Sequence, residues 1–271
     1  MHSITEIEDR ARQIRLEVVK MIGPGKVGHY GGSLSVADIV SVLYFGRMRY
    51  DPKDPSMFGR DRLILSKGHA APAQYAALAI AGFFERHELS TLKKLGSRLQ
   101  GHPDRRQVPG IEASTGSLGQ GLSIGVGMAL GMRIRREPGR VYVVLGDGEL
   151  QEGQVWEAAM AAANYRLDRL TAVVDHNKLQ ATGEIASRLN IGDVAAKWKA
   201  FGWRVCEANG HDVRDLMRAF DEVEAAEGVP GVVLAHTTKG KGVSFIENVP
   251  AYHNGALAPD EYEAALSELS R

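Results

Sequence analysis

RVYVVLGDG at Arg140–Gly148 and LTAVVDHNKL at Leu170–Leu179 are two short runs rich in β-branched residues, and each stops at a polar, turn-forming tip. Between them lies EGQVWEAAMAAAN, Glu152–Asn164, which is rich in alanine and has a helical pattern. This order predicts a strand, a crossover helix and a parallel strand, with both tips at the carboxyl ends of neighbouring strands. In open α/β sheets that edge is where ligands bind.

The two tips carry Asp147 and Asn177, which supply one carboxylate and one amide oxygen. Hard oxygen ligands suit Mg²⁺, and Mg²⁺ held by few protein ligands usually completes its shell with phosphates. Each residue alone is commonplace, because an ordinary turn also contains such side chains. Since both fall at equivalent ends of adjacent predicted strands, the pair predicts a site for a metal ion and a diphosphate.

Composition sets the class of protein. The chain has 271 residues, with 44% hydrophobic and 24% charged residues, as in a globular domain with a sizeable core. Its formal net charge of zero favours neither nucleic acid nor an anionic membrane as a partner. A single cysteine, Cys206, excludes an internal disulfide and a multi-cysteine metal site. No apolar run reaches membrane-spanning length and the N-terminus is amphipathic rather than a signal peptide, so we expect a cytoplasmic protein.

The rest of the chain continues the alternation of strands and helices, without repeats or linkers. It predicts one α/β domain over residues 1–271, with a doubly wound, mainly parallel sheet and helices on both faces. The other expected strands are Arg60–Ser66, Trp203–Glu207 and Val232–His236. The other expected helices are Ile4–Met21, Ser35–Met48, Ala71–Gly82, Val194–Phe201, Val213–Glu227, one from Pro259, and one that opens from a turn within Ser114–Met132.

Five histidines stand in predicted loops after strands or within glycine-rich turns: His29, His69, His102, His236 and His253. Imidazole can bind phosphate oxygens and exchange protons near neutral pH. Each histidine alone is more typical of a surface, but several in one glycine-lined cleft indicate a functional site. For His236, which Thr237 and Thr238 follow, solvent exposure is as well supported as function.

Further polar residues surround the predicted tips. GSLG at Gly116–Gly119 precedes a helix, where free backbone N–H groups can bind phosphate. Lys239 and Lys241 are expected to be solvated rather than catalytic. Glu149 and Glu152 begin the crossover helix. The helix dipole favours acidic residues there, and this explanation is as well supported as a functional role.

Gly146–Gly148, the following helix and Asp175–Lys178 resemble the diphosphate-binding motif of thiamine-diphosphate enzymes, and GDGELQEGQVWEAA looks like the transketolase version. The other motifs follow in transketolase order over nearly the whole chain: Gly28-His29, Ser66–His69, Gly101–Pro103, Thr115–Gly121 and Tyr252-His253.

The resemblance covers only the first of the three domains of a transketolase polypeptide. It implies the N-terminal subunit of a split transketolase, which transfers a two-carbon glycolaldehyde unit from a ketose to an aldose, with sugar phosphates as substrates. The pyrimidine-binding and C-terminal domains would lie on a partner chain, in a heterotetramer of two copies of each. That partner would bring the glutamate that protonates the aminopyrimidine ring of thiamine diphosphate.

The resemblance also implies residue roles. Asp147, the Asn177 side chain and the Leu179 carbonyl are similar to the ligands of Mg²⁺, or of Ca²⁺ or Mn²⁺ in its place. Contacts to thiamine diphosphate are implied for His69, Gly116, Ser117, Leu118, Gly148, Glu149, Asn177 and His253. Catalytic roles are implied for His29, His102 and His253, which would face the substrate and the thiazolium carbon, and for Glu152, the acid between two cofactor sites.

The chain departs from the family pattern at Tyr30, Ser117, Thr182 and Asn254, and none of these changes removes a ligand. The departures at Tyr30 and Asn254 leave the sugar substrate open. One alternative is half of another thiamine enzyme, of the deoxyxylulose-phosphate synthase or 2-oxoacid dehydrogenase type, which the transketolase-like histidines disfavour. Another is a non-catalytic protein that serves assembly. A nucleotide-dependent phosphotransferase is disfavoured because there is no Walker A string and Gln151 stands where the dinucleotide fingerprint needs a glycine.

Overall fold

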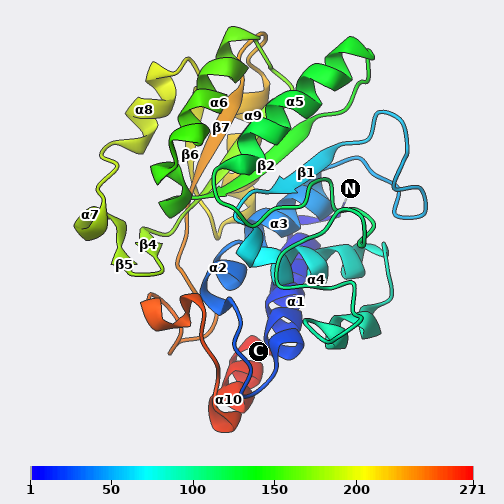
Figure 1. Cartoon of the computed structure of the whole chain (residues 1–271), viewed down its shortest axis with the longest axis vertical. Helices are drawn as coiled ribbons and strands as arrows, with labels where there is room; N and C mark the ends of the chain where they lie inside the picture. Colours follow the sequence, from blue (N-terminus) through cyan, green and yellow to red (C-terminus); the bar gives the residue numbers. More distant parts are fainter. Residues whose placement is uncertain (1, 271) are drawn as a thin grey trace.

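The structure, a computed structural model, describes residues 2–270. Its centre is a five-stranded sheet in the order β1-β2-β3-β7-β6, in which every neighbouring pair is parallel (Figure 1). The strands are β1 (Arg62–Leu65), β2 (Val141–Gly146), β3 (Leu170–His176), β6 (Arg204–Asn209) and β7 (Gly231–His236). The predicted strand-helix-strand unit is confirmed as β2, α6 (Gly153–Asn164) and β3.

Helices cover both faces of the sheet, as predicted for a doubly wound fold. Strand side chains alternate between the two cores: Tyr142 and Val144 belong to one, Val143 and Leu145 to the other. The first core is closed by α1 (Ile4–Ile22), α3 (Ala37–Ser41) with the π-helical turn Val42–Arg47, α4 (Ala71–Ala81) and α9 (Val213–Glu224). The second is closed by α5 (Gln120–Ile134), α6 and α8 (Val194–Ala200).

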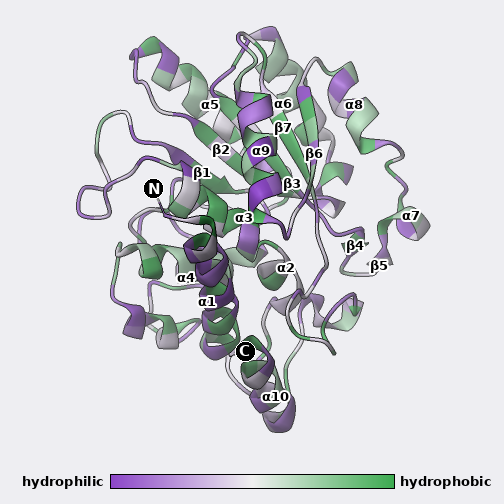
Figure 2. Cartoon of the chain, turned by 180° about the vertical axis from the view of Figure 1, so that it is seen from behind, coloured by the Kyte–Doolittle hydropathy of each residue, from purple (hydrophilic) through white to green (hydrophobic). Residues whose placement is uncertain are grey.

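Figure 2 shows hydrophilic residues along the outer sides of α1 and α9. Polar outer faces and apolar inner faces are what a helix packed on a sheet requires. Within residues 2–270, the structure contains no helix of the length and apolarity needed to cross a membrane.

The glycine-rich segment at 23–33, which separates the first two expected helices, turns helical at α2 (Tyr30–Ser35). A Cβ at Gly31 would lie 3.0 Å from Lys239 Cε, and one at Gly32 would lie 3.3 Å from His69 Nε2. The glycines therefore serve close packing against two other loops, which overrides their poor helix propensity.

Short elements complete the chain. They are the hairpin β4 (Leu179–Gln180) and β5 (Gly183–Glu184), α7 (Ile185–Arg188), α10 (Pro259–Leu269), and 3₁₀ turns at Gly68–Ala70, Arg86–Thr91, Gly148–Gln151 and Pro250–His253.

The strand register places four loop tips at one edge. Leu65 is level with Val144, Gly146 with Asp175, and His176 with His236. The loops that follow β1, β2, β3 and β7 therefore meet, and α2 and the Pro250–His253 turn pack beside them.

Candidate functional site

A cavity of about 240 Å³ opens where these tips meet. Its lining joins residues from loops and helix ends that are far apart in the sequence. They are Gly32, Lys67, His69, Leu118, Gly146, Asp147, Gly148, Glu149, Gln151, Glu152, Asn177, Leu179, Gln180, Ala181, Lys239 and His253. Most of the site residues expected from the sequence are therefore brought to one place.

Asp147 is a buried carboxylate, 2% exposed, at the tip of β2. It accepts hydrogen bonds from the backbone N–H groups of Gly148 (2.8 Å) and Lys178. Among residues 2–270 it forms no ion pair within 4.0 Å. Burial and the nearby Asp175 charge raise the pKa of Asp147 to about 7. A buried carboxylate without a counter-cation is a ready ligand for a cation.

Asn177 lines the same cavity as Asp147, and the next residue, Lys178, donates its backbone N–H to the Asp147 carboxylate. Asn177 Oδ1 accepts from the Leu179 N–H (3.1 Å), and its Nδ2 donates to Asp175 Oδ2 (3.4 Å). The Leu179 carbonyl, the third expected ligand, lines the same cavity and accepts from Lys239 Nζ at 2.7 Å.

Asp175, fully buried, organises the tips from beneath. It accepts hydrogen bonds from Lys67, from Ser35 Oγ (2.5 Å) and from Thr237. Burial opposes its ionisation, but Lys67 and these hydrogen bonds outweigh burial, and the pKa of Asp175 lies below its usual value. The sequence motif contains Asp175, but its position gave no sign of this role.

The expected histidines form one cluster. The ring centroid of His29 lies 5.2 Å from that of His69, 5.6 Å from His253 and 6.2 Å from His102. His69 and His253 are 5.0 Å apart. His236 is not part of the cluster: its ring centroid lies 5.1 Å from that of His176 in a tilted arrangement, and it pairs with Glu207 at 2.6 Å.

All four clustered imidazoles are neutral near pH 7. Burial, followed by the charges of Lys93, His102 and Lys239, lowers the pKa of His29 to about 4. Burial and then Lys239 lower the pKa of His253 to about 3. Burial and Lys67 hold the pKa of His69 well below 6.5, and burial also lowers that of His102. These rings can therefore exchange protons but carry no charge of their own toward an anion.

The expectation that Lys239 is solvated is wrong: it is 2% exposed and lines the cavity. Its Nζ donates to the Leu179 carbonyl and to His253 Nδ1 at 3.0 Å. Since an ammonium only donates, His253 accepts through Nδ1 and presents its Nε2–H. Burial and the Lys67 charge lower the pKa of Lys239 to about 8. Lys241, by contrast, pairs with Glu247 at 3.4 Å and is partly exposed.

Glu149 and Glu152 differ although both line the cavity. Glu149, 2% exposed, accepts from Ser66 Oγ, from Gly119 N (2.9 Å) and from Gly146 N (3.0 Å). Its carboxylate thereby ties three loops together. Glu152 is exposed at the N-cap of α6 and makes no side-chain hydrogen bond there.

The GSLG turn lies at the start of α5. A Cβ at Gly116 would lie 3.1 Å from His102 Cδ2, which shows how closely the turn approaches the histidine cluster. Leu118 lines the cavity, and Ser117 is exposed without lining it. The structure thus brings Leu118 to the cavity and leaves Ser117 at its margin.

The donor set fits a divalent cation and a diphosphate. No group of three or more His, Cys, Asp or Glu side chains suited to a metal occurs in residues 2–270, so a metal here depends on carboxylate, amide and carbonyl oxygens together. That is the donor chemistry of Mg²⁺ with phosphate ligands. The Asp147 carboxylate, which has no ion-pair partner among the described residues, suits the cation. The Lys239 ammonium suits the phosphates.

The chain is similar to known proteins. The family model described as "Transketolase, thiamine diphosphate binding domain" matches residues 7–270. The chain is 44% identical over 266 residues to the 6-deoxy-6-sulfo-D-fructose transketolase subunit of Clostridium sp. (strain MSTE9), covering 98% of this chain and 97% of that protein. It is 40% identical to an apulose-4-phosphate transketolase subunit of Phocaeicola vulgatus, covering 98% of this chain and 95% of that protein.

The fold also matches solved structures of transketolases. The transketolase from Leishmania mexicana superposes with a TM-score of 0.91 at 31% identity, covering 100% of this chain and 42% of that one. This chain thus spans less than half the length of that transketolase.

Proposed function

This chain belongs to the transketolase family, as its thiamine-diphosphate-binding domain, and from that premise we propose that it is the cofactor-binding subunit of a two-chain transketolase. The enzyme would transfer a two-carbon glycolaldehyde unit from a ketose to an aldose. The observation that carries the proposal is the buried Asp147 carboxylate, which has no ion pair within 4.0 Å among the described residues and lies in the same cavity as His69, His253 and Lys239.

We propose that Asp147, Asn177 and the Leu179 carbonyl hold Mg²⁺, or Ca²⁺ or Mn²⁺ in its place. Gly148, Asn177, His69, His253 and the turn at Gly116–Leu118 would hold the diphosphate, with Lys239 as an added cation. Glu149 would act on the cofactor through the loops that it joins. When bound, thiamine diphosphate supplies the nucleophilic carbon for making and breaking carbon–carbon bonds.

The histidines would move protons and orient the sugar. Because His29, His102 and His253 are neutral, each can accept a proton from a sugar hydroxyl or donate an N–H to a carbonyl oxygen. The Lys239 contact sets His253 to present Nε2–H, the tautomer that donates. We propose that Glu152, which is exposed and lines the cavity, meets a second chain.

The partner chain would carry the pyrimidine-binding and C-terminal domains. Three relatives that the chain covers over 95% or more of their length are named as transketolase subunits. We propose a heterotetramer of two copies of each chain, in the cytoplasm. The names of these relatives refer to different sugars, so we propose a ketose as the class of donor substrate and assign no particular ketose.

Reconstitution tests the function. The full chain, mixed with a partner chain that carries the pyrimidine-binding domain, should transfer two carbons from a ketose to an aldose only when Mg²⁺ and thiamine diphosphate are present. A complex that binds the cofactor but transfers nothing across a broad donor–acceptor screen would favour a non-catalytic role.

The histidines can then be separated by a titration of cofactor against ketose. His69→Ala should weaken apparent cofactor affinity, with turnover recovering at saturation. His29→Ala and His102→Ala should instead lower kcat/KM for the ketose by roughly 10²- to 10⁴-fold, the range of one acid–base group. His87→Ala, on an exposed helical turn, is the matched control. Loss of cofactor affinity alone in His29→Ala would refute its substrate-facing role.

A further inference from the structure

A second cavity lies at the opposite edge of the sheet, where β2 and β3 begin. It has a volume of about 320 Å³ and shares no lining residue with the cavity at the strand tips. Its walls are apolar and buried, and comprise Ala129, Met132, Val141 and Leu167. It is bounded by the end of α5 and by the segment between α6 and β3.

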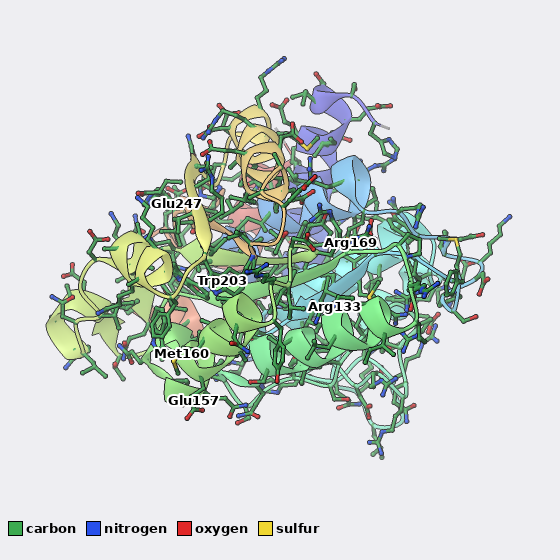
Figure 3. The ribbon with its side chains drawn as sticks, turned by 90° about the horizontal axis from the view of Figure 1, so that it is seen from above. Arg133, Glu157, Met160, Arg169, Trp203 and Glu247 are labelled. Atoms are coloured by element: carbon green, nitrogen blue, oxygen red, sulfur yellow. The ribbon has the colours of Figure 1, made fainter. Side chains whose placement is uncertain are left out.

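Four arginines line this cavity: Arg133, Arg136, Arg166 and Arg169. In the part of the chain that the structure describes, none of the four forms an ion pair within 4.0 Å. Figure 3 is seen from above, onto this end of the molecule, and labels Arg133 on α5 and Arg169 just before β3. Two of the guanidinium groups are anchored by carbonyls, Arg133 to Tyr165 O (2.5 Å) and Arg169 to Pro138 O (2.6 Å).

The two carboxylates of the lining leave this positive charge uncompensated. Glu137 is held by Arg62 (2.9 Å) and Arg135 (2.7 Å), neither of which lines the cavity. Asp168 accepts from the backbone N–H of Gly228 at 3.0 Å. Neither carboxylate pairs with the four arginines.

Backbone conformation singles out two of the arginines. Arg136 (φ 54°) and Arg166 (φ 53°) follow the C-caps of α5 and α6 and adopt the left-handed conformation in which glycine is favoured. A basic residue near a helix C-terminus is favoured by the helix dipole, which accounts for a basic residue after α6 but not for Arg136, because Arg133 already stands in the last turn of α5. Two strained arginines that line one cavity indicate a use for their side chains.

We propose that this cavity binds an organic phosphate, with the phosphate on the arginine rim and an apolar or planar body against the buried walls. Guanidinium groups match phosphate oxygens in bidentate geometry. An apolar floor with a few convergent polar groups is the usual composition of a small-molecule site. This cavity shares no lining residue with the cavity at the strand tips, so its ligand binds apart from the proposed cofactor and sugar.

Glycine substitutions give a sharp test, because they remove the guanidinium groups and relieve the strained backbone. ADP, inorganic pyrophosphate and adenosine are titrated into the full chain by calorimetry in buffer with EDTA. ADP should bind one site and more tightly than pyrophosphate or adenosine. Arg136→Gly combined with Arg166→Gly should weaken ADP by about a hundredfold, roughly tenfold for each charge-assisted contact, with no loss of thermal stability.

Two variants control for other sites. Asp147→Asn changes the cofactor cavity, and Arg214→Ala removes an exposed arginine on α9; both should leave ADP binding unchanged. The proposal is overturned if ADP does not bind at millimolar concentration, or if Asp147→Asn abolishes binding while the double glycine variant keeps it. Equal affinity for ADP and pyrophosphate would overturn the role of the apolar walls. Loss of assembly with the partner chain in the double glycine variant would assign the arginines to a protein interface instead.

Discussion

Asp147 and Asp175 are two carboxylates on adjacent strands, both buried, and their surroundings are opposite. Asp175 has an ammonium partner and three further side-chain donors, and the pKa of Asp175 is lowered. Asp147 has two backbone N–H donors and no ion pair within 4.0 Å among residues 2–270, and burial together with the Asp175 charge raises the pKa of Asp147 to about 7. Asp175 therefore stabilises the fold, whereas Asp147 is available to a ligand in the cavity.

The largest expected effect is on stability, from Asp175→Ala. It leaves the Lys67 ammonium buried without its partner, and breaking such a pair costs about 3–5 kcal/mol. Urea denaturation of the full chain measures the loss. Glu207→Ala, which breaks the exposed pair with His236, is the control and should cost under about 1 kcal/mol. A similarly small cost for Asp175→Ala would mean that the two carboxylates do not differ in role.

Asp147→Asn should have the opposite pattern, with a large loss of cofactor affinity and little loss of stability. The substitution removes a metal ligand, so Mg²⁺-dependent affinity for thiamine diphosphate in the assembled enzyme should fall by about a hundredfold or more. Because no buried ion pair is broken, the free energy of unfolding of the metal-free chain should change by no more than about 1–2 kcal/mol. Calorimetry and urea denaturation on the same preparation test both halves. Unchanged cofactor affinity would refute the metal assignment.

The raised pKa of Asp147 makes metal binding depend on pH. Since Mg²⁺ must displace one proton below pH 7, its apparent affinity should rise about tenfold per pH unit from pH 5 to 7 and level off above. The metal-free fold should respond in the opposite sense. The unfolded chain ionises this group near its ordinary pKa of 3.8 while the folded chain keeps the proton, so this group's contribution to stability falls as pH rises from about 4 to about 7.

Titrations of Mn²⁺ at several pH values, followed by electron spin resonance, measure this slope. Asp147→Asn is the matched control and should abolish the dependence. A slope that survives in that variant would assign the proton to another group.

The smallest effect is expected from Lys239→Met. The Lys239 ammonium favours the ionised form of Asp147, so its loss should raise the pKa of Asp147 further and weaken the cofactor by about tenfold or less. Lys241→Met, in the same turn but paired with Glu247 at the surface, should have no measurable effect. Equal effects of the two substitutions would contradict the placement of Lys239 in the site.

Much of the fold could be predicted because each signal was local. The β-branched runs, their polar tips and the alanine-rich helix between them are readable from sequence periodicity, and β2, α6 and β3 follow them closely. The helical α2 could not be predicted this way, because its glycines fold as a helix only when Lys239 and His69 pack against them.

The sequence by itself determined the parallel α/β class and the placement of Asp147 and Asn177 at neighbouring strand tips, since side-chain period and turn residues act over a few positions. Tertiary structure alone decided that Lys239 is buried, that Asp175 is neutralised by Lys67, and that Glu149 joins three loops. It also gathered the histidines and the four arginines at opposite edges of the sheet. Burial and charge pairing depend on groups that are far apart in the chain, and no local pattern records which of them will meet.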